Sequence, residues 1–430
     1  MFGLSAQPAN FLRQKNLFQV ALLFGLISIL IFVLVLDALS LMEKFHIIGG
    51  KKSQDATRNP KNILVLFDIY KEPYDQYIIY QAALDGSGEK EIWSQSIKNT
   101  YQFSPISYPD VSNDWNYLFY PASFDPPSPE KFTIINSKTG EVKQIPNHLP
   151  NSYNDYAANN CLWNHSDTRI ACEFEDLSQT PGKSSLVLID VKDGTSTILY
   201  DSTKDNSKFT IADILGWDKN DENIFVIGYK NNGEMIYKID INSKKITPKK
   251  GLEEKTGIGL TFYTYYSAQL NKFVYLDGEK TLKIFNPDDQ TVKLLYENPD
   301  HYINAIFLTE DGKSLIFRED DFVSSFDQPV EPKDGVPTSK IMKLNLVNGK
   351  KQEFDYPFDP KKYFLSQMEH YAGGDVVIIS NFETTSVSNP NDYENTLYAY
   401  NLSSKKLTKI FSRSNKDYPD KQIQFGVIRD

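Results

Sequence analysis

Groups that could perform catalysis are the first feature to look for in this sequence of 430 residues, and no convincing set is present. There is no G-x-S-x-G nucleophile motif, because Gly86-Ser87-Gly88 lies in a predicted turn between two strands. The histidines are scattered without the spacing of metal ligands: His46, His148, His165, His301 and His370. The sequence therefore predicts no catalytic residue, no metal site and no cofactor.

Asp218, Asn220 and Glu222 form the acidic group that comes nearest to a metal loop. They occupy alternate positions, as oxygen ligands do in a calcium-binding loop. The glycine and the final bidentate glutamate that such a loop needs are missing. Because Asp and Asn are also the residues that turns prefer, we interpret this segment as a solvated turn.

Cys161 and Cys172, the two cysteines of the chain, flank a predicted hairpin turn. A turn between Ser166 and Asp167 would place them opposite each other on adjacent strands, within bonding range. A one-residue bulge would destroy that register. Two reduced cysteines in the core are the favoured interpretation. A disulfide is the alternative, and an oxidising compartment would favour it.

The charge of the chain argues against nucleic acid as a partner. The formal net charge is −10, and residues 1–60 contain six basic and three acidic residues, so the remainder is more acidic still. An acidic domain repels phosphate backbones. Charged residues make up 24% of the chain and hydrophobic residues 40%, which is typical of a folded globular protein.

A segment of twenty residues without any charge extends from Leu17 to Leu36. A helix of that length spans the ~30 Å hydrocarbon layer of a bilayer, so the segment predicts a transmembrane signal anchor. A cleaved signal peptide is the alternative, because Ala38-Leu39-Ser40 loosely fits a cleavage site, but its apolar core is usually shorter. We expect residues 1–16 to form a cytoplasmic tail and residues 37–60 to form a flexible stalk.

The charges that flank the apolar segment predict its orientation. Arg13 and Lys15 precede it, while Asp37 and Glu43 follow it, which keeps the N-terminus in the cytoplasm. Basic residues farther along the chain argue for the opposite orientation: Lys51, Lys52, Arg58 and Lys61. We give the nearest charges more weight and expect a single-pass protein of the cytoplasmic membrane whose main domain lies outside.

A hairpin signature recurs seven times after residue 60: apolar residues, then Asp or Asn, a polar turn and a second alternating stretch. The residues at that corner are Asp85, Asn136, Asp190, Asp240, Asn286, Asn345 and Asn401. Asp and Asn suit the corner because their side chains can bond the backbone two residues on. A second hairpin precedes six copies, near Asp110, Trp163, Trp217, Tyr266, Leu308 and His370. Two hairpins per unit predict four-stranded antiparallel blades.

One such blade cannot bury both of its faces, so the blades must stack around an axis. A linear β-solenoid is the alternative, but its repeat is usually shorter than about 30 residues. The first signature is preceded by only one clear strand, at residues 62–70. The lone strand at residues 422–429 can supply the missing innermost strand and close the ring. The sequence thus predicts an all-β propeller of about seven blades over residues 61–430.

The inner hairpins resemble the W-S-P-D-G-K repeat of TolB-like propellers, also called PD40 or WD40-like. Thr309-Glu310-Asp311-Gly312-Lys313 is the closest copy, and Trp163 and Trp217 occupy the tryptophan position. Other copies replace Asp-Gly, for example with Ser166-Asp167. The resemblance covers about residues 62–430 and implies the fold and a setting in the cell envelope. The domains that give TolB its partner and prolyl oligopeptidases their hydrolase activity are not recognisable, so neither activity is implied.

Long insertions interrupt the repeat at residues 121–131, 319–339 and 381–395. The repeated short turns should lie at one face of the ring, and these insertions should lie at the opposite face. Loops on a rigid scaffold often carry binding residues, and aromatic and acidic residues provide contact area and charge. The candidate binding residues are Asp320, Asp321, Phe322, Phe326 and Tyr393.

These features favour a non-catalytic binding or scaffolding module of the cell envelope, with a protein or a glycan as its partner. Surface insertions without a task are the simpler explanation of the loops. An envelope lyase or glycosidase is the alternative function, because a propeller can bring distant carboxylates or histidines together at its mouth.

Overall fold

The computed structural model describes the chain between residues 62 and 427, with gaps. The described residues are 62–70, 74–98, 110–120, 123–124, 127–128, 131–146, 156–176, 183–202, 204, 209–230, 233–249, 264–309, 311–321, 338–359, 366–384, 393–417 and 422–427. The predicted tail, apolar segment and stalk, at 1–16, 17–36 and 37–60, lie outside this set. No helix within it is long and apolar enough to cross a membrane.

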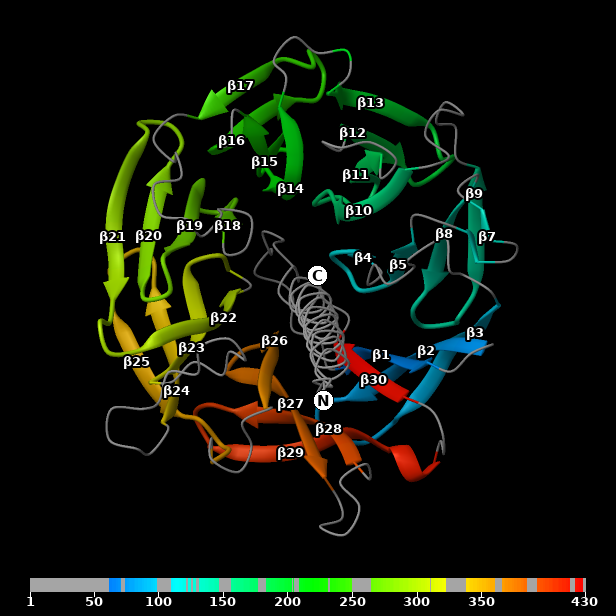
Figure 1. Cartoon of the computed structure of the whole chain (residues 1–430), viewed down its shortest axis with the longest axis vertical. Helices are drawn as coiled ribbons and strands as arrows, with labels where there is room; N and C mark the ends of the chain where they lie inside the picture. The colour runs from blue at the N-terminus through cyan, green and yellow to red at the C-terminus, as the bar shows by residue number, and fades with distance from the viewer. Residues whose placement is uncertain are drawn as a thin grey trace, which may run out of the picture. The chain divides into compact units, whose positions relative to one another are not determined.

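Seven four-stranded antiparallel sheets form the ring of Figure 1, which confirms the predicted all-β propeller with seven blades. The closing blade combines β30 (Gln422–Val427), β1 (Asn62–Tyr70), β2 (Tyr74–Ala83) and β3 (Lys90–Lys98). Blade 2 contains β4 (Asp110–Val111), β5 (Tyr117–Tyr120), β8 (Lys131–Asn136) and β9 (Val142–Pro146). Blade 3 contains β10 (Tyr156–Trp163), β11 (Arg169–Asp176), β12 (Lys183–Asp190) and β13 (Ser196–Asp201).

The remaining blades follow the same order, from the innermost strand outward. Blade 4 contains β14 (Thr210–Trp217), β15 (Asn223–Lys230), β16 (Gly233–Asp240) and β17 (Ile246–Lys249). Blade 5 contains β18 (Thr264–Ser267), β19 (Lys272–Asp277), β20 (Thr281–Asn286) and β21 (Thr291–Glu297). Blade 6 contains β22 (Tyr302–Leu308), β23 (Ser314–Asp320), β24 (Ser339–Asn345) and β25 (Lys351–Asp355). Blade 7 contains β26 (Gln367–Gly373), β27 (Val376–Thr384), β28 (Tyr393–Asn401) and β29 (Lys406–Ser414).

Three short elements complete the described fold. The strands β6 (Ser123–Phe124) and β7 (Pro127–Ser128) pair with each other within the first predicted insertion. The 3-10 helix η2 (Asn415–Asp417) follows the last strand of blade 7.

The core lies between neighbouring blades, because the second strand of each blade has consecutive buried residues, which face both of its neighbours. All seven residues of β23 are buried, as are the first six of β15. One apolar cluster joins Leu186 of blade 3 to Ile224 and Ile239 of blade 4. Each such side chain contributes about 1.5–3 kcal/mol when it is buried. Stacking of blades, rather than pairing within a blade, therefore stabilises the ring.

The outer hairpins, between the third and fourth strands of each blade, are capped as the sequence predicts. The side-chain oxygen at each signature corner accepts a backbone N–H from two or three residues on: Asp85, Asn136, Asp190, Asp240, Asn286, Asn345 and Asn401. Each turn also contains a residue with left-handed backbone, and Gly140 shows why glycine suits this place. A Cβ there would collide with the carbonyl oxygen of Ile92 in the closing blade.

The inner hairpins, between the first and second strands, use a different cap. A buried polar side chain at the start of the turn accepts a backbone N–H from its far side: Ser112, Asn164, Ser267 and Thr309. The half-buried Asp218 acts in the same way, with 2.9 Å to the nitrogen of Glu222. Its carboxylate thus caps the turn, as expected for a turn rather than a calcium loop.

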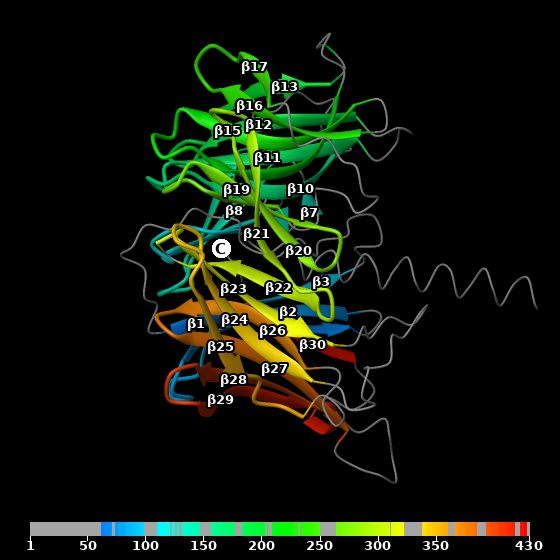
Figure 2. The same cartoon turned by 90° about the vertical axis from the view of Figure 1, so that its left-hand side faces the viewer.

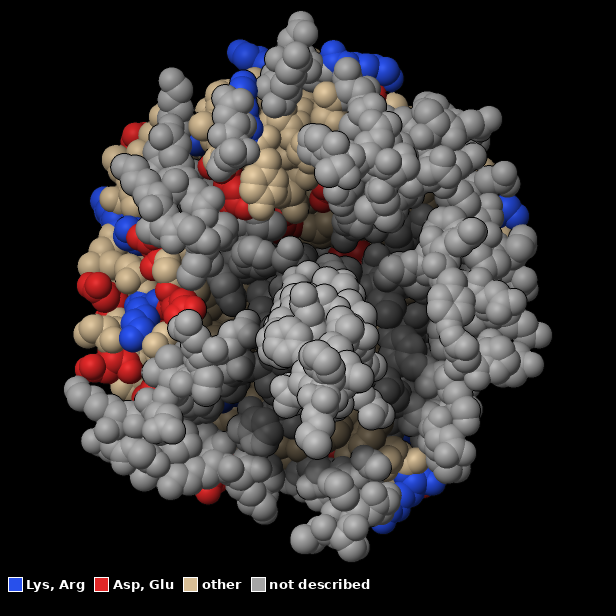
Figure 3. Space-filling model, in the orientation of Figure 1, with Lys and Arg blue, Asp and Glu red and all other residues tan. Residues whose placement is uncertain are grey.

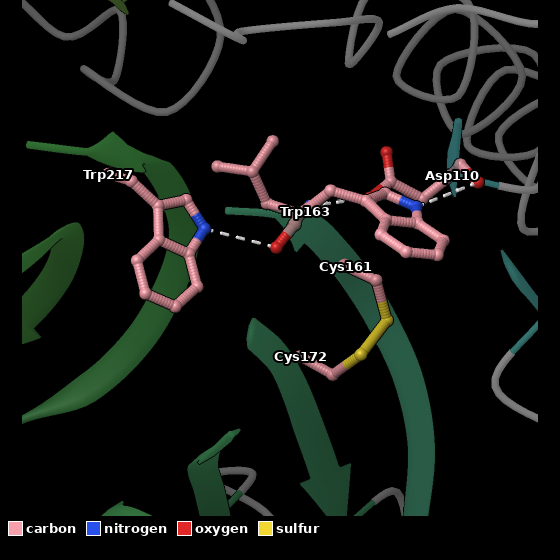
Figure 4. The surroundings of a disulfide bond; sticks show 6 residues. Asp110, Cys161, Trp163, Cys172 and Trp217 are labelled. Carbon is pink, nitrogen blue, oxygen red and sulfur yellow. Dashed lines mark hydrogen bonds between the residues drawn. A yellow bond between two sulfur atoms is a disulfide. The ribbon is translucent and has the colours of Figure 1, made fainter. Parts of the chain in front are cut away.

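Trp163 and Trp217 join adjacent blades through their indole N–H groups. The Nε1 atom of Trp163 donates to the carbonyl oxygen of Asp110 at 3.2 Å, and that of Trp217 donates to Leu162 at 3.1 Å (Figure 4). The two side chains are 1% and 2% exposed. A tryptophan at this position therefore serves both packing and hydrogen bonding between blades.

Asp221 forms a second connection, from the inner turn of blade 4 to that of blade 3. Its carboxylate accepts hydrogen bonds from the backbone N–H of His165 at 3.0 Å and from Nδ2 of Asn164 at 2.9 Å. The Nδ1 atom of His165 lies 2.6 Å from the same carboxylate. Asp167 holds the inner turn of blade 2 in the same way, through the backbone N–H of Asn113 at 2.7 Å.

The ring closes through β30, which pairs antiparallel with β1 from Gln422 to Val427. This confirms that the C-terminal strand supplies the innermost strand of the closing blade. Arg413 of β29 holds the closing blade against blade 7. Its guanidinium lies 4.2 Å from the ring of Phe411 and 4.9 Å from that of Tyr80, and forms an ion pair with Glu89.

Removal of residues 422–430 should destabilise the ring strongly. The deletion removes β30 and exposes the β1 edge, where Val65 and Phe67 are fully buried in the intact ring. Several lost apolar contacts correspond to a fall in Tm of about 10 °C or more, or to aggregation. Thermal unfolding measures the effect, and removal of residues 428–430 alone is the matched control. Equal Tm values for both truncations would show that β30 does not close the ring.

Substitution of Asp221 should make the stability of the ring less dependent on pH. Burial raises the pKa of this carboxyl, but the hydrogen bonds from His165 outweigh that effect and hold the pKa below its ordinary value. Its stabilising contribution is therefore complete above the unfolded pKa of about 3.9 and is lost as the pH falls through the folded pKa. D221N should cost about 1–2 kcal/mol at pH 7, allowing for partial solvent screening.

Thermal unfolding of wild type and D221N between about pH 3 and pH 7 tests this expectation. The Tm difference should shrink toward the acid end. E222Q changes the neighbouring exposed carboxyl and should leave the whole profile unaltered. A Tm difference that is constant with pH would refute the role of the Asp221 carboxylate.

Candidate functional site

The ring has two different faces. The inner and outer hairpin turns lie at one face, called here the turn face, and Figure 2 shows them on its left side. The connections between second and third strands, and between blades, leave the strands at the opposite loop face. The three predicted insertions connect β5 to β8, β23 to β24 and β27 to β28, so all three belong to the loop face. Figure 3 views this face, where acidic and basic side chains mix along the edge beside β21.

Asp320 is the last residue of β23 and is only 4% exposed. Its carboxylate accepts hydrogen bonds from Nε of Arg318 at 2.7 Å, Nδ2 of Asn304 at 2.8 Å and Oγ of Ser339 at 2.5 Å. The sequence placed the start of the insertion at residue 319, but β23 continues through Asp320, so the described boundary is later. This carboxylate holds three strands of blade 6 together at the base of the loop.

Arg318 extends this network into blade 7. Its Nη1 atom donates to the carbonyl oxygen of Ser366 at 2.7 Å, and its guanidinium lies 4.4 Å from the ring of Tyr356. Burial lowers the pKa of Arg318, but Tyr356 and Asp320 raise it above its usual value. The guanidinium therefore remains charged although it is 6% exposed. Removal of either partner would leave a buried charge uncompensated, which commonly costs about 3–5 kcal/mol.

Asp321 closes the base of the longest insertion. Its carboxylate accepts hydrogen bonds from the backbone nitrogen of Thr338 at 2.7 Å and from its Oγ1 at 2.8 Å. The backbone nitrogen of Asp321 donates in return to the carbonyl oxygen of Thr338 at 3.2 Å. The two ends of segment 322–337 are thereby held side by side on a rigid blade.

Tyr393 lies within the third predicted insertion, begins β28 and is partly buried. Its ring stacks on Phe382 of β27, with 4.7 Å between centroids and 27° between planes. The stack lies at the loop end of blade 7, where both rings are partly exposed and Tyr393 also packs against the core. Phe322 and Phe326 lie outside the described residues. Of the five candidates, Asp320 and Asp321 therefore lie at the base of the longest insertion with different partners, and Tyr393 lies on the adjacent blade.

Carboxylates also lie on the innermost strands. Asp213 of β14 is 1% exposed and accepts a hydrogen bond from Asn160 of β10. Glu369 of β26 is 4% exposed and accepts one from Oγ of Ser380 at 2.6 Å. Both strands carry β-bulges at these carboxylates, and bulges are frequent beside functional sites. Among the described residues, no group of three or more His, Cys, Asp or Glu could hold a metal ion.

Aromatic rings from three blades meet near the axis. Trp115 belongs to the inner turn of blade 2, and its ring centroid lies 6.1 Å from that of His370 in blade 7. The ring centroid of Phe307 in blade 6 lies 6.4 Å from that of His370. Trp115 and His370 thus come together across the closing blade, whose two inner strands, β30 and β1, are not joined by an inner turn.

The structure joins Cys161 and Cys172 in a disulfide with 2.11 Å between the sulfur atoms (Figure 4). The predicted register is confirmed, because the two residues are direct partners in β10 and β11. The nearest bulge lies upstream, between Ala158 and Asn160. The sequence favoured two reduced cysteines. The structure contains the disulfide instead, which was the alternative. The bond ties the innermost strand of blade 3 to its neighbour.

Sequence reasoning missed Arg318, Asn304, Tyr356 and Glu369. One signal was available, because Arg318 and Asp320 are two residues apart and therefore share one face of a strand. An Arg-x-Asp pair at the end of an apolar strand indicates a buried ion pair. The other partners come from different strands, and their distances along the chain gave no such signal.

No family model matches the chain, and no curated protein matches it. Among solved structures, it is similar to an oligogalacturonate lyase in complex with manganese, with 11% identity over 82% of this chain and 86% of that chain, at a TM-score of 0.51. Other similar structures are TolB from Acinetobacter baumannii, with 12% identity over 80% and 79% and a TM-score of 0.40, and an oligogalacturonate lyase from Vibrio parahaemolyticus, with 12% identity over 81% and 86% and a TM-score of 0.48. At such low identity, the likeness to the first of these concerns the propeller fold alone.

Proposed function

We propose that this protein is a membrane-anchored binding or scaffolding module, which displays its loop face outside the cytoplasmic membrane. The observation that carries the proposal is that both ends of the longest insertion are held by hydrogen bonds in blade 6. Asp320 and Asp321 are engaged at its base by Arg318 and Thr338, within a rigid blade. A loop with fixed ends on a packed scaffold loses less entropy when it binds than a free segment does.

The chemistry of the loop face fits a protein or glycan partner. Segment 322–337 contains two Phe, three Pro and several acidic residues. The stacked pair of Phe382 and Tyr393 lies at the end of the neighbouring insertion. Aromatic rings supply contact area for peptides and for sugar rings, and carboxylates attract cationic or polar groups.

The proposed location depends on the sequence before the ring and on the disulfide. Residues 17–36 are long and apolar enough for a membrane helix, and Arg13 and Lys15 favour a cytoplasmic N-terminus. A disulfide between Cys161 and Cys172 persists most readily in an oxidising compartment. Both features support export of the ring.

An envelope lyase or glycosidase is the second candidate, and the carboxylates on the innermost strands favour it. Asp213 and Glu369 lie at bulges, where catalytic groups are often placed. Both are nearly inaccessible, and each accepts a hydrogen bond from a neighbouring strand. Their burial suits a structural role better than contact with a substrate, so we favour the binding module.

Replacement of residues 322–337 by a short Gly-Ser link should abolish partner binding and spare folding. The hydrogen bonds between Asp321 and Thr338 are retained. The entropy cost of loop closure changes slowly with loop length, so the Tm should stay within a few degrees. Two pull-down assays measure binding, one with isolated cell-wall glycan and one with cross-linked envelope proteins. Val347→Ser, on the turn face of the same blade, is the matched control. Unchanged recovery of a partner by the loop variant would refute the proposed site.

Protease treatment of intact spheroplasts should digest the ring and leave a membrane-bound N-terminal fragment. In the same cells, a membrane-impermeant maleimide should label Cys161 only after reduction, because the disulfide blocks both thiols and Cys172 is fully buried. Permeabilised cells serve as the control for access. A ring that resists protease until the cells are permeabilised would contradict the proposed topology.

A further inference from the structure

Two neighbouring outer turns of the turn face carry paired lysines without acidic residues. Lys350 and Lys351 end the outer turn of blade 6, and Lys405 and Lys406 end that of blade 7. All four are exposed. The corresponding turn of blade 3, in contrast, contains Asp193 beside its lysine. These two turns are therefore basic, on a chain whose net charge is −10, and two acidic side chains contact the blade 7 turn: Asp355 at Lys405 and Asp375 at Ser403.

Apolar side chains are exposed in the same two turns. Val347 of the blade 6 turn is 67% exposed, and Leu407 beside the blade 7 turn is 37% exposed. Apolar side chains among lysines are typical of surfaces that rest at a membrane interface. There, the apolar side chains and the aliphatic part of each lysine side chain enter the headgroup layer.

The chain enters the ring on this face. Asn62 pairs with Ala83, at the end of β1 that lies beside the outer turn of the closing blade. The closing blade packs directly on blade 7, through a cluster that includes Phe67 and Phe411. The segment before residue 62, which contains the apolar residues 17–36, therefore joins the ring next to the basic edge.

We propose that the turn-face edge of blades 6 and 7, formed by Val347, Lys350, Lys351, Lys405 and Lys406, rests on an anionic phospholipid surface. The proposal deepens the proposed function, because it assumes that residues 17–36 anchor the chain. Lysines near a membrane are attracted by anionic headgroups within about one Debye length, ~10 Å at 0.1 M salt. The loop face then points away from the membrane, toward its partner.

The four lysines do not contribute equally. Lys405 is paired with Asp355 at 2.5 Å, and Lys351 lies 4.3 Å from the ring of Tyr296. Lys350 and Lys406 are therefore the better test positions. Lys138 and Lys192 lie in the outer turns of blades 2 and 3, away from the proposed contact, and serve as matched controls.

The test uses the full chain in vesicles of phosphatidylcholine, with or without phosphatidylglycerol. A polarity-sensitive label on V347C reports contact through quenching by spin-labelled headgroups, and the disulfide keeps the native cysteines unlabelled. Quenching should be about twofold stronger with phosphatidylglycerol and should weaken at high salt. K350Q/K406Q should remove the difference, whereas K138Q/K192Q should retain it.

Three results would overturn the proposal. A chain that floats with the vesicles but shows equal quenching in both lipids would overturn the lipid contact alone. A label on Y229C, an exposed position at the loop end of β15, that is quenched as strongly as the label on V347C would also overturn the lipid contact. A chain that does not float with vesicles would overturn the membrane anchor, and the orientation with it.

Discussion

The antiparallel pairing of β30 with β1 is the interaction on which the rest of this structure depends. A blade is fully buried only when a neighbouring blade covers each of its two faces. A ring that is not closed would therefore leave two apolar faces in water. Phe67 shows why closure is needed, because it is fully buried and packs against Phe411 of blade 7. Arg413 secures the same seam from the outer side, through its contacts with Tyr80 and Glu89. Two strands that are far apart in sequence thus stabilise all seven blades.

Closure also explains why the two faces differ. The turn face consists of short hairpins whose corners are capped by their own side chains and connected by residues such as Asp167 and Asp221. Insertions there would break contacts between blades. The loop face has no such repeated connection among the described residues, so it tolerates long segments. Arg318 and Asp320 provide a fixed base for the longest one, which joins the stability of the ring to the proposed binding surface.

Sequence patterns predicted the parts of this fold that repeat. The Asp or Asn corners, the register of Cys161 with Cys172 and the closing strand all follow from local rules of turns and pairing. The candidate site was harder to predict, because Asp320 resembles a solvent-exposed loop carboxylate in sequence. Its burial results from partners on β22, β23 and β24, and such tertiary contacts leave little trace in local composition. The pairing state of the cysteines also depends on the compartment as well as on geometry.

The central claim is that the loop face, and not the turn face, binds the partner. Site-specific photo-crosslinking in living cells tests it most directly, with benzoylphenylalanine at Tyr302 or at Val347. Both positions belong to blade 6, but Tyr302 lies opposite Asp320 at the loop end of β22, and Val347 lies in the outer turn. The account predicts a discrete protein or glycan adduct at Tyr302 and none at Val347. A partner adduct at Val347 with none at Tyr302 would contradict it.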